Sequence, residues 1–325
     1  MNDFSLIRKP ISDELKTFAN MFDESLSQGE GLLDDALTHI RQRGGKRMRP
    51  ILTMLIAKCF GDVNDVTQNA ALGLELLHTA SLVHDDVVDE STERRGQASV
   101  NASYNNKVAV LVGDYILSTA LQRVSLTKDS VIINALAELG RTLSKGEILQ
   151  LTNFENDGIS EEIYYKIIES KTASLFKCCA EMGAISAHAG EEQIAAAMEF
   201  GRIIGIIFQI RDDIFDYYDS KEIGKPTGND MAEGKITLPA IFALNKTQDK
   251  EMLALAKKVK NRSISTDEIT VFIEFTKKNG GIEYAEEVME KLHAEALSFV
   301  DKYVDDSDIA NALRSYLDYI IERKL

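Results

Sequence analysis

The stretch that decides the fold is residues 74–89, LELLHTASLVHDDVVD. Leu74, Leu77, Ser81 and Leu82 recur in it at intervals of three and four positions, which is the spacing of one helical face. The stretch contains no proline or glycine, and it runs from an apolar segment into a cluster of aspartates. We therefore expect one long helix that is mostly buried and carries its acidic residues near the C-terminal end.

The same spacing recurs along most of the chain, for example at Leu15, Phe18, Ala19 and Phe22. Alternating strand patterns of useful length are absent, and the chain has only 4 prolines. The β-branched run that begins at Val108 continues without a turn signal, so we expect a buried helix there too. The expected helices span residues 12–26, 31–42, 49–60, 64–89, 107–124, 130–154, 160–188, 191–218, 237–245, 249–260, 267–279, 281–301 and 308–322. The pattern predicts an all-α protein.

No long linker, Ser/Gly-rich tract, short-period repeat or low-complexity segment divides the sequence. The charged segment near Asp249–Asp267 is typical of surface helices rather than of a domain boundary. Length alone favours about two domains. The continuous helical pattern favours one, so we expect residues 1–325 to form a single domain.

A second segment repeats the acidic pattern of the first, and both have the form DDxxD after an apolar run. Residues four apart lie on one face of a helix, so Asp85 with Asp89 and Asp212 with Asp216 form like-charged pairs that repel. Water offsets such repulsion on a surface, and a divalent cation offsets it in a cleft. Oxygen ligands select hard cations such as Mg²⁺. The apolar approach to both clusters favours a metal site over two solvated helix ends.

Basic residues lie beside these acidic motifs in a chain whose formal net charge is −15. The loop 43–50, RGGKRMRP, combines cations suited to phosphate oxygens with glycines that permit close backbone approach. Further cations follow the first motif, lie within a helix or follow the second motif: Arg94, Arg95, Lys171, Lys225 and Lys235. Each alone is typical of a solvated surface. Together they indicate a diphosphate held by metal ions on one side and by basic groups on the other.

His78 lies seven residues before Asp85, on the same helical face. A lone histidine on an apolar helix is usually a core residue, and its alignment with the carboxylates makes ligand contact an equal alternative. His84 precedes Asp85 directly and points elsewhere, so we expect no catalytic role for it.

The overall composition excludes several classes of protein. A strongly acidic chain repels nucleic acid. The three cysteines are Cys59, Cys178 and Cys179, an odd and sparse set without a CxxC zinc pattern, which fits a reduced cytoplasmic protein. The first residues lack the features of a secretory signal. No run of about 18 uninterrupted apolar residues occurs, so we expect no membrane span.

These segments together resemble the trans-prenyl diphosphate synthases, also called polyprenyl synthetases. The matching segments, in family order, are GGKRMRP (44–50), ELLHTASLVHDDVVDESTERRG (75–96), GDYILSTA (113–120), KTASLF (171–176), FQIRDDIFDY (208–217) and GKPTGNDMAEGKITLP (224–239). The resemblance implies a bundle of long helices around a deep central cavity, usually in a homodimer. It also implies an enzyme that uses two or three Mg²⁺ ions to join isopentenyl diphosphate to an allylic diphosphate.

The resemblance further implies a role for each matching residue. Those assigned to magnesium are Asp85, Asp86, Asp89, Asp212 and Asp216. Those assigned to the allylic diphosphate are Arg94, Lys171, Thr172, Gln209, Lys225 and Lys235. Those assigned to isopentenyl diphosphate are Lys46, Arg49, His78 and Arg95. The catalytic set is Asp85, Asp86, Asp89, Lys171, Gln209 and Asp212, with Gln209 beside the reacting carbons and Asp230 binding a metal through water.

Product length depends on the residues just before the first acidic motif. In the family, bulky aromatic residues four or five positions upstream block the cavity, and here those positions are Ser81 and Ala80. Small side chains there should open at least another helical turn of tunnel, about 5 Å or one prenyl unit. We expect a long, octaprenyl-like product for a quinone, with a possible peripheral membrane contact for its release. A geranylgeranyl- or farnesyl-length product is the alternative. Leu136, Leu139 and Leu143 are candidates for the tunnel floor, although core packing explains them as well.

Three other functions share parts of this pattern. A terpene cyclase has an acidic motif and an apolar cavity, but it normally lacks the GGKRMRP loop and the equivalent of Arg95, because it needs no second diphosphate. A non-catalytic partner subunit usually loses the acidic motifs, which are intact here. A helical interaction protein with solvated acidic ends explains the least of the sequence.

Overall fold

The protein is almost entirely helical in the computed structural model, which describes residues 4–27, 29–42, 44–94, 96–153, 159–218 and 227–322. The helices are α1 Phe4–Arg8, η1 Lys9–Ile11, α2 Ser12–Ser25, α3 Leu32–Gln42, α4 Met48–Phe60, α5 Asp65–Val88, α6 Val100–Ser103, α7 Asn106–Ser125, α8 Ser130–Asn153, α9 Glu161–Ile168, η2 Glu169–Ala173, α10 Ser174–Ser186, α11 Glu191–Phe215, α12 Asn229–Ala232, α13 Leu238–Thr247, α14 Lys250–Lys260, α15 Thr266–Lys278, α16 Gly281–Tyr303 and α17 Ser307–Glu322. The prediction of an all-α fold is confirmed.

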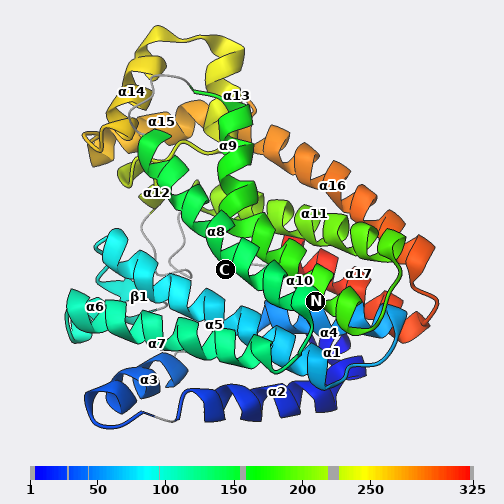
Figure 1. The fold of residues 1–325 in the computed structure, drawn as a ribbon. Coiled ribbons are helices and arrows are strands. Elements are labelled where there is room, and N and C mark those ends of the chain that lie inside the picture. The colour runs from blue at the N-terminus through cyan, green and yellow to red at the C-terminus, as the bar shows by residue number, and fades with distance from the viewer. Residues whose placement is uncertain are drawn as a thin grey trace.

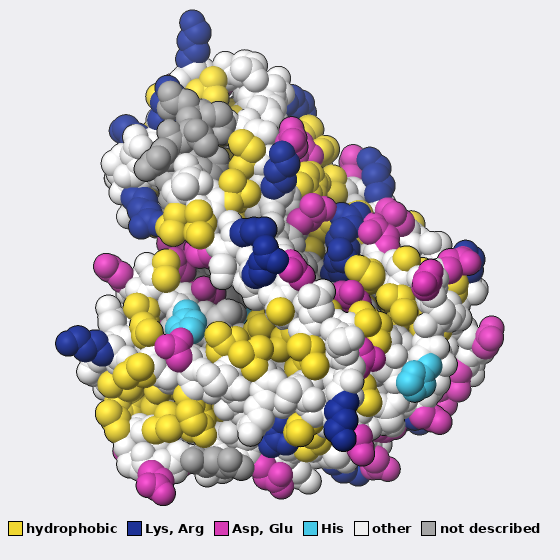
Figure 2. Space-filling model, in the orientation of Figure 1, with side chains coloured by type: hydrophobic (Ala, Val, Ile, Leu, Met, Phe, Trp, Pro, Cys, Tyr) yellow, Lys and Arg dark blue, Asp and Glu magenta, His cyan; other side chains and the backbone are white. Residues whose placement is uncertain are grey.

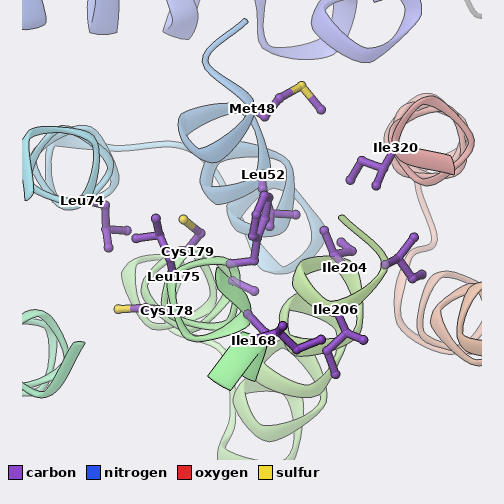
Figure 3. Close-up of a cluster of buried hydrophobic side chains, with 14 of the residues drawn as sticks. Met48, Leu52, Leu74, Ile168, Leu175, Cys178, Cys179, Ile204, Ile206 and Ile320 are labelled. Carbon is purple, nitrogen blue, oxygen red and sulfur yellow. The ribbon is translucent and has the colours of Figure 1, made fainter. Parts of the chain in front are cut away.

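Helix α10 lies at the centre of the bundle and packs against α4, α5, α8 and α11 (Figure 1). It is apolar on several sides, as a helix surrounded by other helices must be. Leu175 and Cys179 of α10 belong to the same buried cluster as Leu52 of α4 and Ile204 of α11, whereas Cys178 points to the opposite side of α10, toward α8 (Figure 3). The two acidic helices therefore flank the same central helix.

Glycines allow the helices around α10 to approach one another closely. A Cβ atom on Gly183 of α10 would lie 2.4 Å from the carbonyl oxygen of Thr53 in α4. A Cβ atom on Gly205 of α11 would lie 2.4 Å from the Cα atom of Ala173 in η2. No real Cβ atom fits at such distances, so these helix pairs depend on glycine at the contact.

Helix α5 begins at a capping box and packs along α7. The Asn64 side chain accepts a hydrogen bond from the Thr67 backbone N–H at 3.0 Å, and the Thr67 hydroxyl accepts one from the Asn64 N–H at 3.2 Å. The α14–α15 pair lies at one end of the molecule and α2 with α3 at the opposite end (Figure 1). The first acidic motif falls where α5 ends, between these two ends.

The structure differs from the predicted elements mainly in short segments. The helix expected over 160–188 is divided into α9, the π-helical turn η2 and α10. The loop expected over 90–100 contains a small antiparallel pair, β1 Glu93–Arg94 and β2 Gln97–Ala98. Such short pieces carry no periodic signal, since two to five residues do not complete a recognisable hydrophobic repeat.

Helix α11 is the one described helix that is long and apolar enough to cross a membrane by length and composition, although no uninterrupted apolar run predicted it. Half of its most apolar window is buried inside the structure, as is common for a core helix. Its packing against α10 and α16 accounts for that apolar character.

Candidate active site

The first acidic motif lies at the C-terminal end of α5, where the helix dipole disfavours negative charge. Asp85 is half-buried and Asp89 is exposed at the helix C-cap. The pKa of Asp85 is raised to about 6, chiefly by burial and also by the charges of Glu147 and Asp89, while the charge of Lys171 lowers it. An acidic pair in this position is unfavourable for the helix itself, which indicates that it serves a ligand.

Asp86 lies on another face of α5 and is fully buried. The Arg94 Nε atom of β1 donates a hydrogen bond to Asp86 Oδ1 at 2.6 Å. The short β1–β2 pair places Arg94 there by pairing it with Gln97. Asp86 and Arg94, which the sequence assigned to metal and to the allylic diphosphate, thus contact each other.

The second acidic motif lies at the C-terminal end of α11. Asp212 is half-buried. Asp216 accepts hydrogen bonds from the backbone N–H groups of Asn229 and Asp230 at 2.9 and 3.1 Å. Burial raises the pKa of Asp216 to about 7, with a further contribution from the charge of Asp230, while those two backbone hydrogen bonds lower it. Asp213 is 2% exposed and points inward, as Asp86 does in the first motif.

Two lysines lie close to the acidic motifs. Lys171 in η2 forms an ion pair with Glu147, and its Nζ atom donates to Gln150 Oε1 at 3.0 Å. Its charge also lowers the pKa of Asp85 in the first motif. Lys171 therefore lies close enough to the first motif to affect its protonation.

Lys235 is the second of these lysines. Its Nζ atom lies 3.7 Å from Asp230 Oδ1 and 2.5 Å from Glu233 Oε2. Burial lowers the pKa of Lys235, but the charges of Asp230, Glu233 and Asp89 together raise it above its ordinary value. Asp89 belongs to the first motif and Asp230 contacts Asp216 of the second. Asp89 of the first motif and Asp230, which contacts the second motif, therefore act on one cation, and the two motifs border one site.

A cavity of about 220 Å³ lies beside these groups. Its polar lining includes Lys171, Thr172, Gln209, Asp213, Asp230 and Lys235. Its apolar lining includes Ile159, Ile167, Ile168, Ile236 and Ile241. Figure 2 shows acidic side chains around a hollow between the layer that contains α5 and α7 and the part that contains α12 to α15. The combination of cations with an apolar wall suits an anion with a hydrocarbon tail.

A smaller cavity of about 70 Å³ lies near the glycine-containing loop before α4. Its lining includes Gly44, Gly45, Arg47, His78 and Arg94. His78 thus faces a cavity rather than only the core. Arg47 was counted in the basic loop but given no separate role, and its left-handed backbone conformation, with φ of 52°, sets the direction of the loop into α4.

Lys46 and Arg49 do not line either cavity. The Lys46 Nζ atom lies 5.2 Å from the Tyr319 ring centre, and the Arg49 guanidinium lies 5.3 Å from the Phe176 ring centre. The Nε atom of Arg49 is buried and has no hydrogen-bond partner among the described residues. A buried guanidinium nitrogen without an acceptor suits an anionic ligand that supplies one.

Two predicted contacts, Arg95 and Lys225, lie outside the described residues. Ala80 is 1% exposed in the core, and the Ser81 hydroxyl donates to the His78 carbonyl oxygen at 2.9 Å. Neither residue lines the two cavities described above. Leu136 and Leu139 are buried in the main hydrophobic cluster, and Leu143 packs against it.

The donor set fits a hard divalent cation, because the acidic motifs offer carboxylate oxygens only. Within the described ranges of the chain, no group of three or more His, Cys, Asp or Glu side chains is arranged to hold a metal ion by itself. Mg²⁺ commonly takes only one or two carboxylates and completes its shell with water and substrate phosphate. The separated pairs are therefore compatible with ions shared between protein and diphosphate.

Several polar residues of the site were not predicted from the sequence, chiefly Tyr164, Glu147 and Gln150. Tyr164 and Gln150 line the larger cavity, and Glu147 pairs with Lys171. Tyr164 lies seven residues before Lys171, and this helical spacing was the one available signal. Glu147 and Gln150 lie on α8, whose approach to η2 is a tertiary contact.

Comparison with known proteins gives a consistent result. A family model described as polyprenyl synthetase matches residues 30–275. An octaprenyl diphosphate synthase of Haemophilus influenzae is 35% identical over 288 residues, covering 88% of this chain and 86% of the relative. One from Escherichia coli is 38% identical over 223 residues, covering 68% of this chain and 69% of the relative.

Solved structures agree in fold. The crystal structure of a geranylgeranyl pyrophosphate synthase from Bacteroides thetaiotaomicron is 49% identical with a TM-score of 0.88, covering 99% of this chain and 100% of the other. A polyprenyl synthase from Caulobacter crescentus, crystallised with calcium and isoprenyl diphosphate, is 27% identical with a TM-score of 0.92, covering 99% and 98% of the two chains.

Proposed function

This chain belongs to the polyprenyl synthetase family and is a prenyltransferase that elongates isoprenyl diphosphates, and on that premise we propose which residues carry the reaction. The substrates are isopentenyl diphosphate and an allylic diphosphate, joined head to tail with release of diphosphate. The proposed site is the larger cavity together with the two acidic helix ends that border it.

One observation supports this proposal above the others. The charge of Lys171 acts on Asp85, and the charge of Asp89 acts on Lys235, whose nearest acidic neighbours, Asp230 and Glu233, follow the second motif along the chain. Carboxylates and cations from both halves of the chain therefore share one electrostatic environment. A diphosphate with metal counter-ions is a ligand that both sets can hold at once.

Asp85 and Asp89 would hold magnesium on one side of the cavity, and Asp212 would hold it on the other side. Asp86 and Asp216 belong to the same proposed metal-binding set. Two or three ions are part of this proposal. When bound, the metal supplies Lewis-acid stabilisation of the negative charge that develops on the leaving diphosphate.

The chain's own cations contribute to the same step. Breaking the allylic C–O bond places charge on the leaving diphosphate, and Lys171 and Lys235 are fixed by ion pairs where they can stabilise it. The isoleucines of the cavity wall exclude water, which would quench the allylic cation. Gln209 would lie beside the reacting carbons. The departing diphosphate is our candidate acceptor for the proton lost at the end of the cycle.

The smaller cavity would hold the diphosphate of isopentenyl diphosphate. His78 and Arg47 line it. Arg49 lies outside this lining, and its buried Nε atom has no acceptor among the described residues. Lys46 and Arg95 complete the predicted set for this substrate. A second diphosphate site separates this function from that of a terpene cyclase, which needs one.

We propose a long-chain product, because small residues at positions 80 and 81 precede the first motif. The octaprenyl diphosphate synthases at 35% and 38% identity favour this choice. A geranylgeranyl-length product is the second candidate, favoured by the geranylgeranyl pyrophosphate synthase at 49% identity. A single domain, a homodimer, a cytoplasmic location and a peripheral membrane contact for product release belong to the same proposal.

The decisive experiment supplies radiolabelled isopentenyl diphosphate, farnesyl diphosphate and Mg²⁺ to the purified chain and sizes the products by chromatography. Several additions to farnesyl diphosphate support the long-chain proposal, and one addition supports the geranylgeranyl alternative. EDTA should abolish incorporation. Full incorporation in EDTA would contradict the metal assignment.

A further inference from the structure

A chain of buried hydrogen bonds connects three helical segments at the wall of the larger cavity. The Thr172 hydroxyl donates to Gln209 Oε1 at 2.7 Å. Gln209 Nε2 donates to Asp213 Oδ1 at 2.8 Å. The Tyr164 hydroxyl donates to Asp213 Oδ2 at 2.7 Å. The chain thus runs from η2 to α11 and ends on α9.

The chemistry of these groups fixes the direction of the chain. Both oxygens of Asp213 act as hydrogen-bond acceptors here, so the glutamine presents its amide nitrogen to Asp213. Its carbonyl oxygen then faces Thr172, whose hydroxyl can donate. An amide has nearly the same shape after a half-turn, so its neighbours rather than its packing decide which end faces which way.

Asp213 can fix the orientation of the Gln209 amide only if its own carboxyl group is held in place. It is 2% exposed, and both of its oxygens are engaged, one by Gln209 and one by Tyr164. Tyr164 is 7% exposed and packs edge to face with Tyr165 at 5.4 Å between ring centres. Loss of the Tyr164 hydroxyl would leave one buried carboxylate oxygen without a donor, and the carboxylate would turn to find another.

We propose that Tyr164 is a positioning residue for chain elongation, which fixes Asp213 and, through it, the amide of Gln209 at the cavity wall. All four residues of the hydrogen-bond chain line the cavity that also contains Lys171 and Lys235. The inference rests on the proposed function, which places Gln209 beside the reacting carbons. Tyr164 acts on Gln209 indirectly, through Asp213.

The test compares Tyr164→Phe with Tyr165→Phe in the full-length enzyme. Both changes remove one hydroxyl from adjacent residues of α9 and keep the ring, but only the Tyr164 hydroxyl contacts Asp213. Tyr164→Phe should lower kcat about tenfold, as expected for one lost hydrogen bond to a buried carboxyl group. The KM of each diphosphate should stay within about twofold, because the lysines and arginines are unchanged. Tyr165→Phe should match the wild type in kcat.

A double-mutant cycle separates positioning from general stability. In a Gln209→Leu background, Tyr164→Phe should change kcat by less than about twofold, because the amide that it orients is gone. Asp213→Asn is a second variant, since its amide cannot accept at both positions, and it should reproduce the loss of kcat with KM unchanged. Rates are taken per folded enzyme, from thermal unfolding of each variant.

Two results would overturn the inference: equal kcat for Tyr164→Phe and Tyr165→Phe, or an undiminished tenfold loss in the Gln209→Leu background. A different result would overturn the proposed site, namely full turnover by Asp85→Ala. An inactive Asp85→Ala enzyme together with a fully active Tyr164→Phe enzyme would refute the role of Tyr164 alone.

Discussion

The aspartates of the two DDxxD motifs differ in their surroundings although the motifs match in sequence. Asp85, Asp89 and Asp212 are half-buried or exposed, whereas Asp86 and Asp213 are almost fully buried. A buried carboxylate is costly unless donors satisfy it, and Asp86 and Asp213 have such donors in Arg94 and in the Tyr164–Gln209 pair. The middle aspartate of each motif is therefore held by protein donors, whereas the outer aspartates Asp85, Asp89 and Asp212 are more accessible.

Removing an outer carboxylate should abolish the reaction and leave the fold intact. We expect Asp85→Ala and Asp212→Ala each to lower kcat by about a hundred- to a thousandfold, because the charge on the leaving diphosphate loses stabilisation. The measurement is incorporation of labelled isopentenyl diphosphate. Asp65→Ala is the matched control, since Asp65 is an exposed residue at the other end of α5. Activity of Asp212→Ala equal to that control would remove the second motif from the site.

At the scale of elements, the π-helical turn η2 is the feature that shapes the site. It lies between α8 and α11, where a Cβ atom on Gly146 would come within 2.7 Å of the Ser170 Cβ atom and one on Gly205 within 2.4 Å of the Ala173 Cα atom. Turns of this type are frequent at functional sites. Here the turn carries Lys171 and Thr172, so glycines on two neighbouring helices set the position of two ligand-facing side chains.

Gly205→Ala should therefore disturb both stability and activity. The added methyl group has no room against the η2 backbone, so we expect a loss of about 1 to 3 kcal/mol in the free energy of unfolding. We also expect kcat/KM for elongation to fall about tenfold, because Lys171 and Thr172 move. Denaturant unfolding and steady-state kinetics measure the two effects.

Gly190→Ala is the control on the same helix. A Cβ atom there would meet only the Gln193 side chain, at 3.6 Å, which is ordinary contact. Its loss of stability should stay below about 1 kcal/mol, the scale of an N-cap change. Equal effects at Gly190 and Gly205 would show that the close approach of α11 to η2 is unimportant.

The position of Ala80 on α5 yields a prediction about product length. If the hydrocarbon tail passes this residue, Ala80→Tyr should shorten the product by several prenyl units, because a large side chain fills at least one turn of tunnel. Ser81→Phe, at a half-buried position, tests the same tunnel with less strain on the core. Chromatographic sizing of the products is the measurement. Unchanged length in both variants would mean that the tail takes another path.

At the scale of the whole molecule, a chain of net charge −15 binds a doubly anionic substrate by concentrating its cations locally. Lys171 and Lys235 border the larger cavity, and Arg47 and Arg94 border the smaller one. The carboxylates between them are partly buried and close together, which raises the pKa of Asp85 to about 6 and that of Asp216 to about 7.

Activity should consequently fall as the pH drops through about 7 to 6, well above the ordinary range of carboxylates. Protonated Asp85 and Asp216 hold cations poorly, and a higher Mg²⁺ concentration should move the midpoint to lower pH. Because both pKa values are raised in the folded state, proton uptake by these groups between about pH 7 and 4 favours the folded form. Loss of turnover should therefore precede unfolding, as followed by circular dichroism. A flat activity profile from pH 8 to 5 would contradict this prediction.

Much of the fold could be predicted from the sequence because its signals are local. Each long helix has a hydrophobic period that buries one face or, for α10, several, and α5 begins at a capping box formed within four residues. The short elements β1, β2, α6 and α12 escaped prediction, since a few residues carry no period. The π-helical turn η2 between α9 and α10 was not predicted either, because its position depends on glycines of two other helices.

The sequence by itself determined the helical fold class, the paired carboxylates and the basic loop, since residue type and spacing along one helix suffice for these. Only the tertiary structure decided that Lys235 lies within electrostatic reach of Asp89 and of Asp230 beside the second motif, that Asp86 and Asp213 turn inward, and that Tyr164 contacts Asp213. These facts depend on how helices pack across separations of tens to hundreds of residues. Packing at that range is set by the shapes of whole helix faces, which no local pattern encodes.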